Sequence, residues 1–383
     1  MKNSSKKYHV MHVVDSLEVG GMENGVVNIA NHIDKEQFRI SVCCLSHPGR
    51  LSTRIKDGDI AIISLGWSGG FSLKLIFELA RVFNKQNVDI IHTHGWQTLI
   101  YCSVASLLSG VPVLINGEHG RFHLEKLRRR VAYKIISTMV DKYVTVSKSL
   151  ENKLVMILPA ASRKVVTIPN GVDLLKFVPQ TKDAAESIKS GLGLPATSLV
   201  IGHVGRLEPV KNHQMLLNAF ASLCREFENL HCVLIGDGIL RSSLENLVKQ
   251  LGVSDRVHFI GRVENPHQLM PIFDVFVSTS LNEGMSNVIL EAMACGKPIV
   301  ATDVGDNGKL VEASGNGFLV QVEDSTLLES SIKLLLTDKD LNQRFGVRSR
   351  NLVEEKFGIM NMVSSYQETY LEAIVKKRGP HDL

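Results

Sequence analysis

Short apolar runs rich in valine and isoleucine alternate along the chain with longer stretches in which apolar residues recur at helical spacing. This alternation is typical of βαβ units, which build parallel sheets covered by helices. The strands predicted for a first sheet are YHVMHVV (8–14), FRISVCCL, IAIISL, VDIIHTH, VPVLING, KYVTVS and KVVTIPNG. Those predicted for a second sheet are SLVIGHVGRL, HCVLIGDG, RVHFIG, VFVSTS, PIVATDVG and NGFLVQV. The pattern therefore predicts an α/β fold with two parallel sheets.

The break between these two sets of strands predicts two domains of similar size. The polar segment 172–196 carries proline and glycine, and we expect it to connect a first domain, residues 1–171, to a second, residues 197–359. A last helical stretch within 360–383 is expected to pack back on the first domain. Ligands of parallel α/β domains bind at the carboxyl ends of strands, so we expect the site in a cleft between the domains.

Composition limits the classes of protein to which the chain can belong. Its 383 residues are 44% hydrophobic and 21% charged, which is ordinary for a soluble globular protein. The net charge of +4 is too small for a nucleic-acid footprint, and no basic run carries interleaved aromatic residues. The six cysteines form no C-x-x-C pair, and neither a secretory leader nor eighteen consecutive apolar residues occur. These features predict a cytoplasmic protein with reduced core cysteines.

The segment LNEGMSNVILEAMACGKP, residues 281–298, places Glu283 and Glu291 on either side of a predicted helix start. The helix formers VILEAMA follow, and a Gly-Lys-Pro sequence ends the helix. Glu283 lies in the loop before the helix and can accept from a sugar hydroxyl, while Glu291 can accept from a ribose diol. Read alone, the segment is explained equally well by a surface helix with two solvated glutamates.

The start of this helix is also a candidate anion site. The first backbone N–H groups of a helix have no intrahelical partner and lie at the positive end of the helix dipole. They can therefore bind a phosphate without any side-chain charge. The residues that can present these donors to a diphosphate are Ser286, Asn287 and Val288.

Two cations follow the first strand of the second set. Arg206 closes the run SLVIGHVG, and Lys211 directly precedes a helix that begins near Asn212. Such a cluster can neutralise a diphosphate and stabilise the charge that grows on it as a glycosidic bond breaks. The alternative is a pair of exposed basic residues in a loop.

Three strand ends in the first domain carry candidate ligand contacts. Gly20 and Gly21 open a helix and allow close backbone approach, although the loop lacks a dinucleotide fingerprint and can be a simple tight turn. His119 follows VPVLINGE, but a lone loop histidine is more often a structural hydrogen-bonding residue than a catalyst. His92 and His94 lie two residues apart on a predicted strand and therefore face one side.

Five motifs occur together in the order found in one enzyme family. They are Gly20-Gly21 with Glu23, Glu118-His119-Gly120, IPNGVD at 168–173, Gly205-Arg206 with Lys211, and the segment with Glu283 and Glu291. The ordered set resembles the retaining GT-B glycosyltransferases of family 4, also described as glycosyl transferases group 1, over nearly the whole chain. The resemblance implies two Rossmann-like domains that face a central cleft, the first binding the acceptor and the second binding a nucleotide sugar.

The same resemblance implies roles for single residues. Arg206 and Lys211 stabilise the leaving group, His119 contacts the transferred sugar, and the Gly20-Gly21 loop faces the donor phosphates. Retention is then expected to proceed by substitution on one face of the sugar, with the leaving phosphate oxygen taking the acceptor proton. Glu283 therefore orients the sugar, and the two carboxylates of a glycosidase are not needed.

The base of the nucleotide is expected to lie beside FIGRVEN, residues 259–265. The resemblance implies that backbone groups recognise it there, those of Gly261, Arg262 and Val263. In the segment ATDVGDNGKLVE the chain carries Asp306 and Gly308, where relatives commonly show a second glycine and a proline. This departure, and the diphosphate and ribose that UDP and GDP share, leave the choice between UDP- and GDP-linked donors open.

Two patterns that suggest metal ligands are interpreted otherwise. Asp57-Gly58-Asp59 spells the D-x-D signature of a different glycosyltransferase fold, but it lies before a short strand and is typical of a turn. Without a third spaced ligand, His92 and His94 predict a lining of the acceptor side of the cleft. Because Arg206 and Lys211 supply the cationic role of a metal, we expect no cofactor and no metal.

The acceptor side carries a possible membrane contact. Residues 121–140, RFHLEKLRRRVAYKIISTMV, combine six Arg and Lys residues with apolar positions at helical spacing. Such a helix can dock on anionic lipid, or it can be a solvated face that packs its apolar side on the core. The expected function is transfer of a hexose or N-acetylhexosamine to a lipid-linked or polysaccharide-precursor acceptor of the cell envelope or exopolysaccharide. The alternatives are a nucleotide-sugar epimerase and a non-catalytic partner protein.

Overall fold

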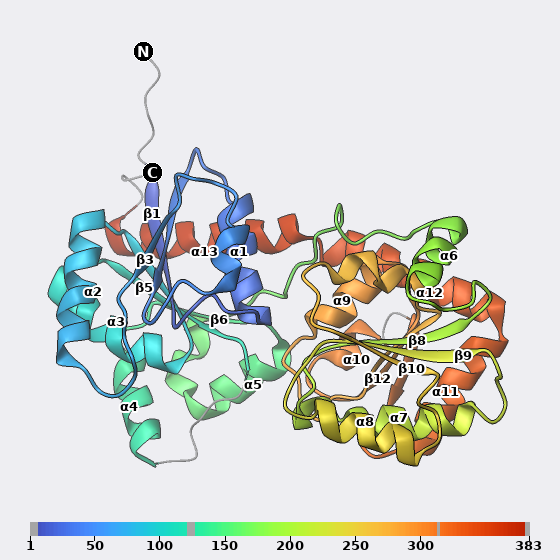
Figure 1. Ribbon diagram of the computed structural model, residues 1–383. Coiled ribbons are helices and arrows are strands. Elements are labelled where there is room, and N and C mark those ends of the chain that lie inside the picture. The colour runs from blue at the N-terminus through green and yellow to red at the C-terminus, as the bar shows by residue number, and fades with distance from the viewer. Residues whose placement is uncertain (1–6, 121–126, 312–314, 380–383) are drawn as a thin grey trace. The chain divides into compact units, whose positions relative to one another are not determined.

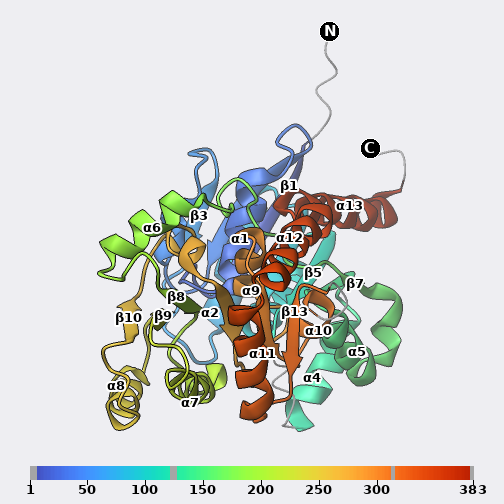
Figure 2. The ribbon, with the colours of Figure 1, turned by 90° about the vertical axis from the view of Figure 1, so that its right-hand side faces the viewer.

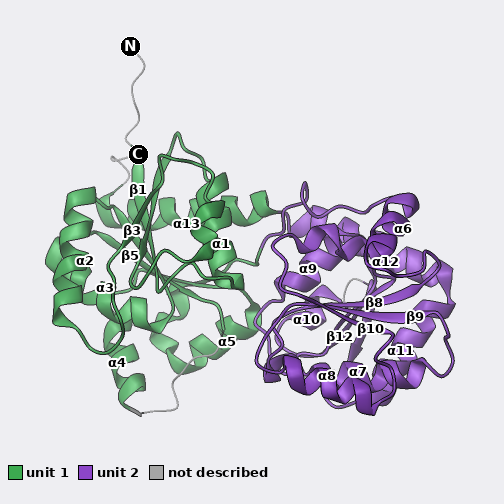
Figure 3. Ribbon diagram, viewed as in Figure 1, with its two compact units in different colours: residues 1–170, 359–383 green, residues 171–358 purple. Residues whose placement is uncertain are grey.

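The computed structural model describes residues 7–120, 127–311 and 315–379. The chain divides into two compact units, here called unit 1 (residues 1–170 and 359–383) and unit 2 (residues 171–358) (Figure 1, Figure 3). Unit 1 therefore takes segments from both ends of the chain, while unit 2 is one continuous segment.

Unit 1 is built on a seven-stranded parallel sheet with the strand order β3-β2-β1-β4-β5-β6-β7. The strands are β1 (Tyr8–Val14), β2 (Phe38–Cys44), β3 (Ala61–Ser64), β4 (Ile90–His94), β5 (Val113–Glu118), β6 (Lys142–Thr145) and β7 (Val165–Thr167). The helices are α1 (Gly21–His32), α2 (Leu73–Gln86), α3 (Trp96–Ser109), α4 (Leu127–Ser137), α5 (Lys148–Ile157) and α13 (Ile359–Arg378), with short 3-10 helices at Arg50–Arg54 and Pro159–Lys164.

Side chains of β1 alternate between two hydrophobic cores, as the two-residue period of a strand requires. Met11 and Val13 point into a core shared with α2 and α3. Tyr8 and Val10 point into the opposite core, which is shared with α1 and α13. Helices thus cover both faces of the sheet, which a parallel sheet needs because both of its faces are apolar.

The last helix, α13, packs on the first sheet, as the sequence predicted (Figure 2). Its buried stripe contains Met362, Tyr366 and Tyr370, which recur every four residues along one helix face. The end of the helix is fixed by an ion pair of 2.6 Å between Arg378 Nη2 and Asp89 Oδ1. The C-terminal segment is therefore part of the core of unit 1.

Unit 2 repeats the same strand order in a six-stranded parallel sheet, β10-β9-β8-β11-β12-β13. Its strands are β8 (Leu199–Val204), β9 (Leu230–Ile235), β10 (Val257–Gly261), β11 (Val275–Ser278), β12 (Ile299–Thr302) and β13 (Gly317–Val320). Its helices are α6 (Lys182–Gly191), α7 (His213–Leu223), α8 (Arg241–Gln250), α9 (Asn287–Ala294), α10 (Asn307–Leu310), α11 (Ser325–Thr337) and α12 (Lys339–Lys356), with 3-10 helices at Pro209–Lys211, Pro266–Gln268 and Met270–Ile272. The core on one face is formed with α7, α8 and α11.

The boundary between the compact units falls at Asn170 and Gly171. Residues 172–196, where the sequence predicted a connection between domains, belong to unit 2 and include α6. Thr181 caps this helix by accepting a hydrogen bond from Ala184 N at 3.3 Å. The segment looked like a linker because α6 is polar: its one buried residue is Lys189, whose Nζ donates to Ser198 O at 2.7 Å.

Candidate active site

Each sheet has a point at which its strand order reverses, between β1 and β4 in unit 1 and between β8 and β11 in unit 2. Ligands of open parallel sheets bind outside the carboxyl ends of the strands at this point. In unit 2 the loops that leave β8 and β11 carry Lys211 and Glu283. The candidate site is therefore assembled from these two loops and their neighbours.

Lys211 and Glu283 form the central contact of the site. Lys211 Nζ lies 2.5 Å from Glu283 Oε1, and the two side chains are only 18% and 14% exposed. Ser280 Oγ donates a second hydrogen bond, of 2.8 Å, to the same carboxylate oxygen. Within the described residues both bonds fall on Oε1, so Oε2 remains available to accept from a ligand hydroxyl.

The position of Lys211 is set by backbone contacts between the two loops. Lys211 ends the 3-10 helix Pro209–Lys211, and Asn212 follows in the left-handed conformation with φ of 48°. Thr279 Oγ1 donates to Lys211 O at 3.0 Å and to Asn212 O at 2.9 Å. Leu281 N donates to Val210 O at 2.8 Å. The cation is thus held by the strand end that also carries Glu283.

The helix start expected to bind phosphate is α9, which follows Glu283 closely. Ser286 is its N-cap residue but makes no side-chain cap bond, and Asn287 and Val288 form the first turn. Ser286 is 2% exposed, and its Oγ has no hydrogen-bond partner among the residues that the structure describes. A buried hydroxyl without a partner is costly, so this atom is a candidate ligand contact. Glu291 lies on the same helix and is partly exposed.

The loop after β12 supports Glu283 from behind. Asp306 N donates to Gly284 O at 3.0 Å. Gly305 has a φ of +60°, and a Cβ there would lie 2.2 Å from Glu283 O, so only glycine fits. Asp306, one of the two departures noted above, is 4% exposed and accepts a 2.9 Å ion pair from Lys309. The departure therefore lies against the backbone that follows Glu283, the residue that we expect to orient the sugar.

Arg206 lies differently from Lys211. Its side chain is 69% exposed, and Nη1 contacts Glu208 Oε1 at 2.8 Å. The structure thus brings Lys211 and Glu283 together, while the Arg206 side chain extends into solvent. Beside it, Gly236 has a φ of +142°, and a Cβ at this position would lie 1.9 Å from Gly205 O. The absence of a Cβ at Gly236 therefore allows the backbone of the loop after β9 to pack against the backbone of the loop after β8.

The expected base-binding segment begins at the end of β10. Gly236 N donates to Gly261 O at 2.8 Å, and Gly261 adopts a φ of +78°. The residues that follow are Arg262, which is exposed, and Val263, which is partly exposed. Their backbone groups therefore lie next to the glycine loop, at the edge of the sheet away from β11.

His203 is a site residue that the sequence did not reveal. It lies on β8 and is 1% exposed, and its Nδ1 donates to Val277 O at 2.8 Å. Its Nε2 has no partner among the described residues, and it would lie 3.0 Å from a Cβ at Gly205. Burial lowers the pKa of His203 to about 4. A strand histidine has no sequence signature that separates it from a core residue.

In unit 1, His119 directly follows β5 and is partly exposed. Its Nε2 shares a 3.0 Å hydrogen bond with His94 Nδ1. Burial lowers the pKa of His119 to about 4, so the ring is neutral at physiological pH. The preceding Glu118 accepts from Asn116 Nδ2 at 2.7 Å and from the Tyr133 hydroxyl, and burial raises its pKa.

The expectation that His92 and His94 line the acceptor side is not compatible with their burial. Their side chains are 0% and 5% exposed, because β4 is a central strand covered by α13. Gly20 and Gly21, in contrast, lie at the accessible start of α1, where a Cβ on Gly20 would lie 2.2 Å from Glu23 Oε2. The D-x-D sequence is a turn in which Asp59 N donates to Asp57 Oδ1 at 3.0 Å. Among the described residues, no helix combines the length and apolar character needed to cross a membrane.

Two α/β units with this strand order match the fold of the GT-B glycosyltransferases. Residues 19–175 match the family described as Glycosyltransferase Family 4, and residues 184–352 match Glycosyl transferases group 1. The chain belongs to this glycosyltransferase family, as its ordered motifs predicted.

Relatives match the chain over most of its length. It is 29% identical to the Escherichia coli UDP-Gal:alpha-D-GlcNAc-diphosphoundecaprenol alpha-1,3-galactosyltransferase, covering 98% of this chain and 100% of the relative. It is 30% identical to the putative glycosyltransferase EpsF of Bacillus subtilis, covering 79% and 80% of the two chains. The crystal structure of Anabaena HepE in complex with UDP has a TM-score of 0.83 and 22% identity, covering 96% of this chain and 100% of that one. At that identity the structural likeness shows the fold.

Proposed function

We propose that the protein is a retaining, metal-independent glycosyltransferase that moves a hexose or N-acetylhexosamine from UDP to a lipid-linked or polysaccharide-precursor acceptor. The observation that carries this proposal is the contact between Lys211, Glu283 and Ser280 at the switch point of unit 2. It presents one cation and one free carboxylate oxygen beside the start of α9. A diphosphate needs positive charge and backbone donors, and a sugar needs a hydroxyl acceptor.

The choice of UDP over GDP rests on the relatives. The E. coli relative is named for a UDP-galactose donor, and HepE was crystallised with UDP. In this chain the base is assigned to the backbone of residues 261–263, where Gly261 is held by its bond to Gly236. Glu291, on the exposed side of α9, is assigned to the ribose diol.

In the proposed reaction the bond from the anomeric carbon to the β-phosphate oxygen breaks, and the acceptor oxygen bonds to that carbon on the same face. The leaving phosphate oxygen takes the acceptor proton. Lys211 and the start of α9 stabilise the charge that grows on the diphosphate, and the exposed guanidinium of Arg206 adds to this when it turns from Glu208. Glu283 Oε2 orients the sugar. For His119, whose ring is neutral, the role proposed from the family resemblance is contact with the transferred sugar. Since these groups supply the positive charge, no metal or cofactor is required.

The acceptor is proposed from the relatives and from α4. The E. coli relative is named for a diphosphoundecaprenol acceptor, which is a lipid. The first part of the basic stretch, residues 121–126, lies outside the described residues, but α4 exposes Val131 (51%) and Ile135 (64%) next to the exposed Arg128 and Lys134. An apolar and basic face of this kind suits the surface of an anionic membrane. We therefore place the enzyme on the inner face of the cytoplasmic membrane, in envelope or exopolysaccharide synthesis.

The donor test is incubation of purified protein with UDP- and GDP-sugars, with and without membrane lipid extract. Transfer from a UDP-sugar that needs the extract and persists in EDTA supports the proposal, and NMR of the new glycosidic linkage reports retention or inversion. Conversion of the donor without acceptor indicates an epimerase. Donor binding without any conversion indicates a non-catalytic partner protein.

The membrane test is co-sedimentation with vesicles of anionic or neutral lipid. Changing Arg128, Arg129 and Arg130 together to Ser is expected to reduce binding to anionic vesicles, because each cation near a charged leaflet contributes about 1 kcal/mol. A matched control removes charge from another helix, by changing Lys74, Arg81 and Lys85 of α2 to Ser. Equal binding by the α4 variant and the unchanged protein rejects α4 as the anchor.

A further inference from the structure

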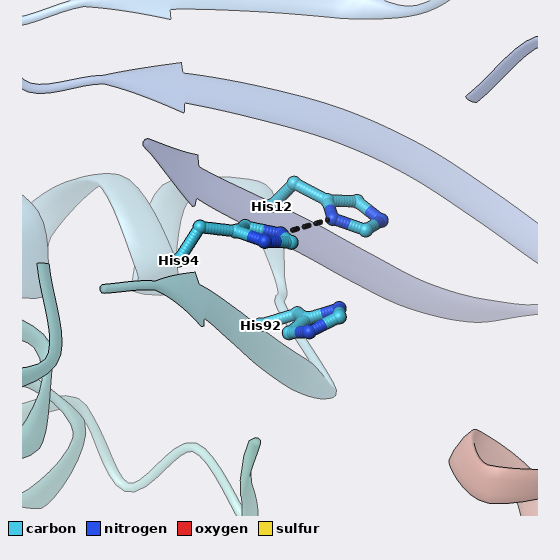
Figure 4. Close-up of side chains that lie close together, drawn as sticks. All are labelled: His12, His92 and His94. Atoms are coloured by element: carbon cyan, nitrogen blue, oxygen red, sulfur yellow. Dashed lines mark hydrogen bonds between the residues drawn. The ribbon is translucent and has the colours of Figure 1, made fainter. Parts of the chain in front are cut away.

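Three histidines lie together at the switch point of unit 1. They do not belong to the group of residues in unit 2 that we propose to bind the diphosphate. His12 on β1 and His92 on β4 are paired in register, so their side chains leave the sheet on the same face. His94 follows two residues later on β4 and points to that face as well. Figure 4 shows the three rings lying close together. One ring nitrogen from each histidine lies within 4.8 Å of the other two.

The distance between one nitrogen of His12 and one nitrogen of His94 is close to the distance between two ligand nitrogens of a metal ion. His12 Nδ1 and His94 Nε2 are 2.9 Å apart (Figure 4). Two imidazole nitrogens bound to one tetrahedral zinc ion, at about 2.0–2.1 Å each, lie about 3.3 Å apart. The pair must therefore open by only a few tenths of an ångström. Gly117 leaves room for such a shift, because the absent Cβ would lie 3.3 Å from His92 Nε2 and 3.2 Å from His94 Nδ1.

The other nitrogen of each ring is engaged by a neighbouring side chain. His92 Nδ1 hydrogen-bonds to the Tyr370 hydroxyl at 2.8 Å, and His12 Nε2 lies 3.5 Å from the same oxygen. His94 Nδ1 shares its 3.0 Å bond with His119 Nε2. Metal-bound histidines usually donate their second N–H to such a partner, which fixes the tautomer and the ring orientation. With each outer nitrogen donating, a lone pair remains on His12 Nδ1, His94 Nε2 and His92 Nε2.

One feature of the cluster remains costly when the protein alone is considered. His92 Nε2 is buried and has no hydrogen-bond partner within the described part of the chain. The nitrogens of His12 and His94 that lie 2.9 Å apart need no ion, because His12 Nδ1 can donate to His94 Nε2 while the Tyr370 hydroxyl donates to His12 Nε2. A shared cation removes the cost at His92, since it binds one lone pair from each of the three rings.

We propose that His12, His92 and His94 form a binding site for one divalent late transition-metal ion of the zinc and copper class. Imidazole nitrogen is the ligand type that these ions prefer, and all three rings are buried and neutral, the form that binds a metal. Through Tyr370 the bound ion fixes α13 to the strands at the switch point. It takes no part in sugar transfer and is independent of the donor that unit 2 binds.

The test uses the full chain without a histidine tag, stripped of metal by a chelator. Zinc is titrated in competition with a chromogenic chelator, and cobalt is titrated while its visible absorption is recorded. We expect one tight equivalent per chain, and a cobalt spectrum with the intense visible bands of a low-coordinate site with three histidine ligands, which are lost when zinc displaces cobalt. The unchanged protein alone can overturn the proposal, by showing neither the tight equivalent nor the cobalt bands.

Variants then locate the ion. His94→Asn and His12→Asn are expected to abolish the tight equivalent, and Tyr370→Phe to weaken it about 10- to 100-fold, the usual effect of losing an outer partner. The matched control is His258→Asn, which breaks the part-buried pair of His231 and His258, whose ring nitrogens are 3.0 Å apart in unit 2. Circular dichroism checks that each variant is folded. Loss of the tight equivalent in the control variant, or its retention in folded His94→Asn protein, overturns the assignment.

Discussion

Opposite changes at Lys211 and Glu283 should alter nucleotide binding in opposite directions. Lys211 Nζ and Glu283 Oε1 are 2.5 Å apart and largely shielded from solvent, so their charges cancel in the free protein. Lys211→Met leaves an uncompensated carboxylate beside the expected diphosphate, and we predict weaker UDP binding. Glu283→Gln keeps a side chain of the same shape and leaves the lysine uncompensated, and we predict tighter UDP binding but slower transfer.

The size of each effect follows from the charges. At about 4 Å and an effective dielectric constant near 20, two unit charges interact by about 4 kcal/mol. Lysine and glutamate act on the diphosphate with opposite signs, so their effects on UDP binding offset each other in part, and we expect changes of about 10-fold, or roughly 1.4 kcal/mol, in either direction. Transfer is more sensitive, because removing a preorganised donor from a developing oxyanion costs about 10²- to 10³-fold in kcat. We expect Lys211→Met to fall in that range.

Calorimetry with UDP and initial rates of sugar transfer measure the two effects separately. The matched control is Lys333→Met, which breaks an ion pair of 2.6 Å to Glu226 whose side chains are 45% and 47% exposed. An exposed pair contributes about 0–1 kcal/mol, so the control should leave binding and transfer nearly unchanged. The reasoning is refuted if Lys211→Met and Glu283→Gln weaken UDP binding equally, because the pair would then be a structural unit and not a balance of charges at the ligand.

Further predictions concern stability. Gly305→Ala should destabilise the protein by about 1–3 kcal/mol in urea unfolding and slow sugar transfer, since residue 305 has a φ of +60° and a Cβ there would meet Glu283 O at 2.2 Å. The control is Gly58→Ala, because a Cβ at Gly58 has open space; it should change neither the unfolding free energy nor the transfer rate. The unfolding free energy should fall between pH 6.5 and pH 4, because His203 takes up a proton in the unfolded chain near pH 6.5 but in the folded protein only at about pH 4. This lowered pKa corresponds to about 3 kcal/mol, and His203→Phe should make the pH dependence shallower. Tyr370→Phe should cost about 1–3 kcal/mol in thermal unfolding, because it leaves buried ring nitrogens without their partner; an unchanged midpoint would show that the hydroxyl is dispensable.

The alternation of strands and helices predicted most of the fold from the sequence. Burial alternates with a period of two residues on β1, and on α13 the buried residues Met362, Tyr366 and Tyr370 recur every four residues. Both patterns can be read from residues close together in the sequence, so both elements could be predicted. The segment 172–196 was read as a connection because the face of α6 is polar and its buried residue is a lysine.

The parts of the candidate site that lie within one loop could be predicted from the sequence. The contacts between residues that follow two different strands could not. The helix start after Glu283 can be read from a few adjacent residues. The pairing of Lys211 with Glu283 requires β8 beside β11, and the third histidine of the cluster requires β1 beside β4. Neither adjacency follows from local sequence, which is why the sequence does not point to His12 and predicts that His92 and His94 line the acceptor side of the cleft. Burial by α13, which comes from the far end of the chain, corrects that interpretation.

The two switch points differ in charge, and this difference supports the division of roles between them. At the point in unit 2 the groups are a lysine and a carboxylate, which are largely shielded from solvent and carry opposite charges. At the point in unit 1 the groups are histidines whose pKa values are lowered by burial, to about 3 for His12, so the site carries no charge with which to attract a diphosphate. A neutral cluster of nitrogen lone pairs is suited to a cation, and a neutral His119 beside it to a sugar. We therefore propose different ligands for two sheets with the same strand order, because different side chains follow the same strand ends.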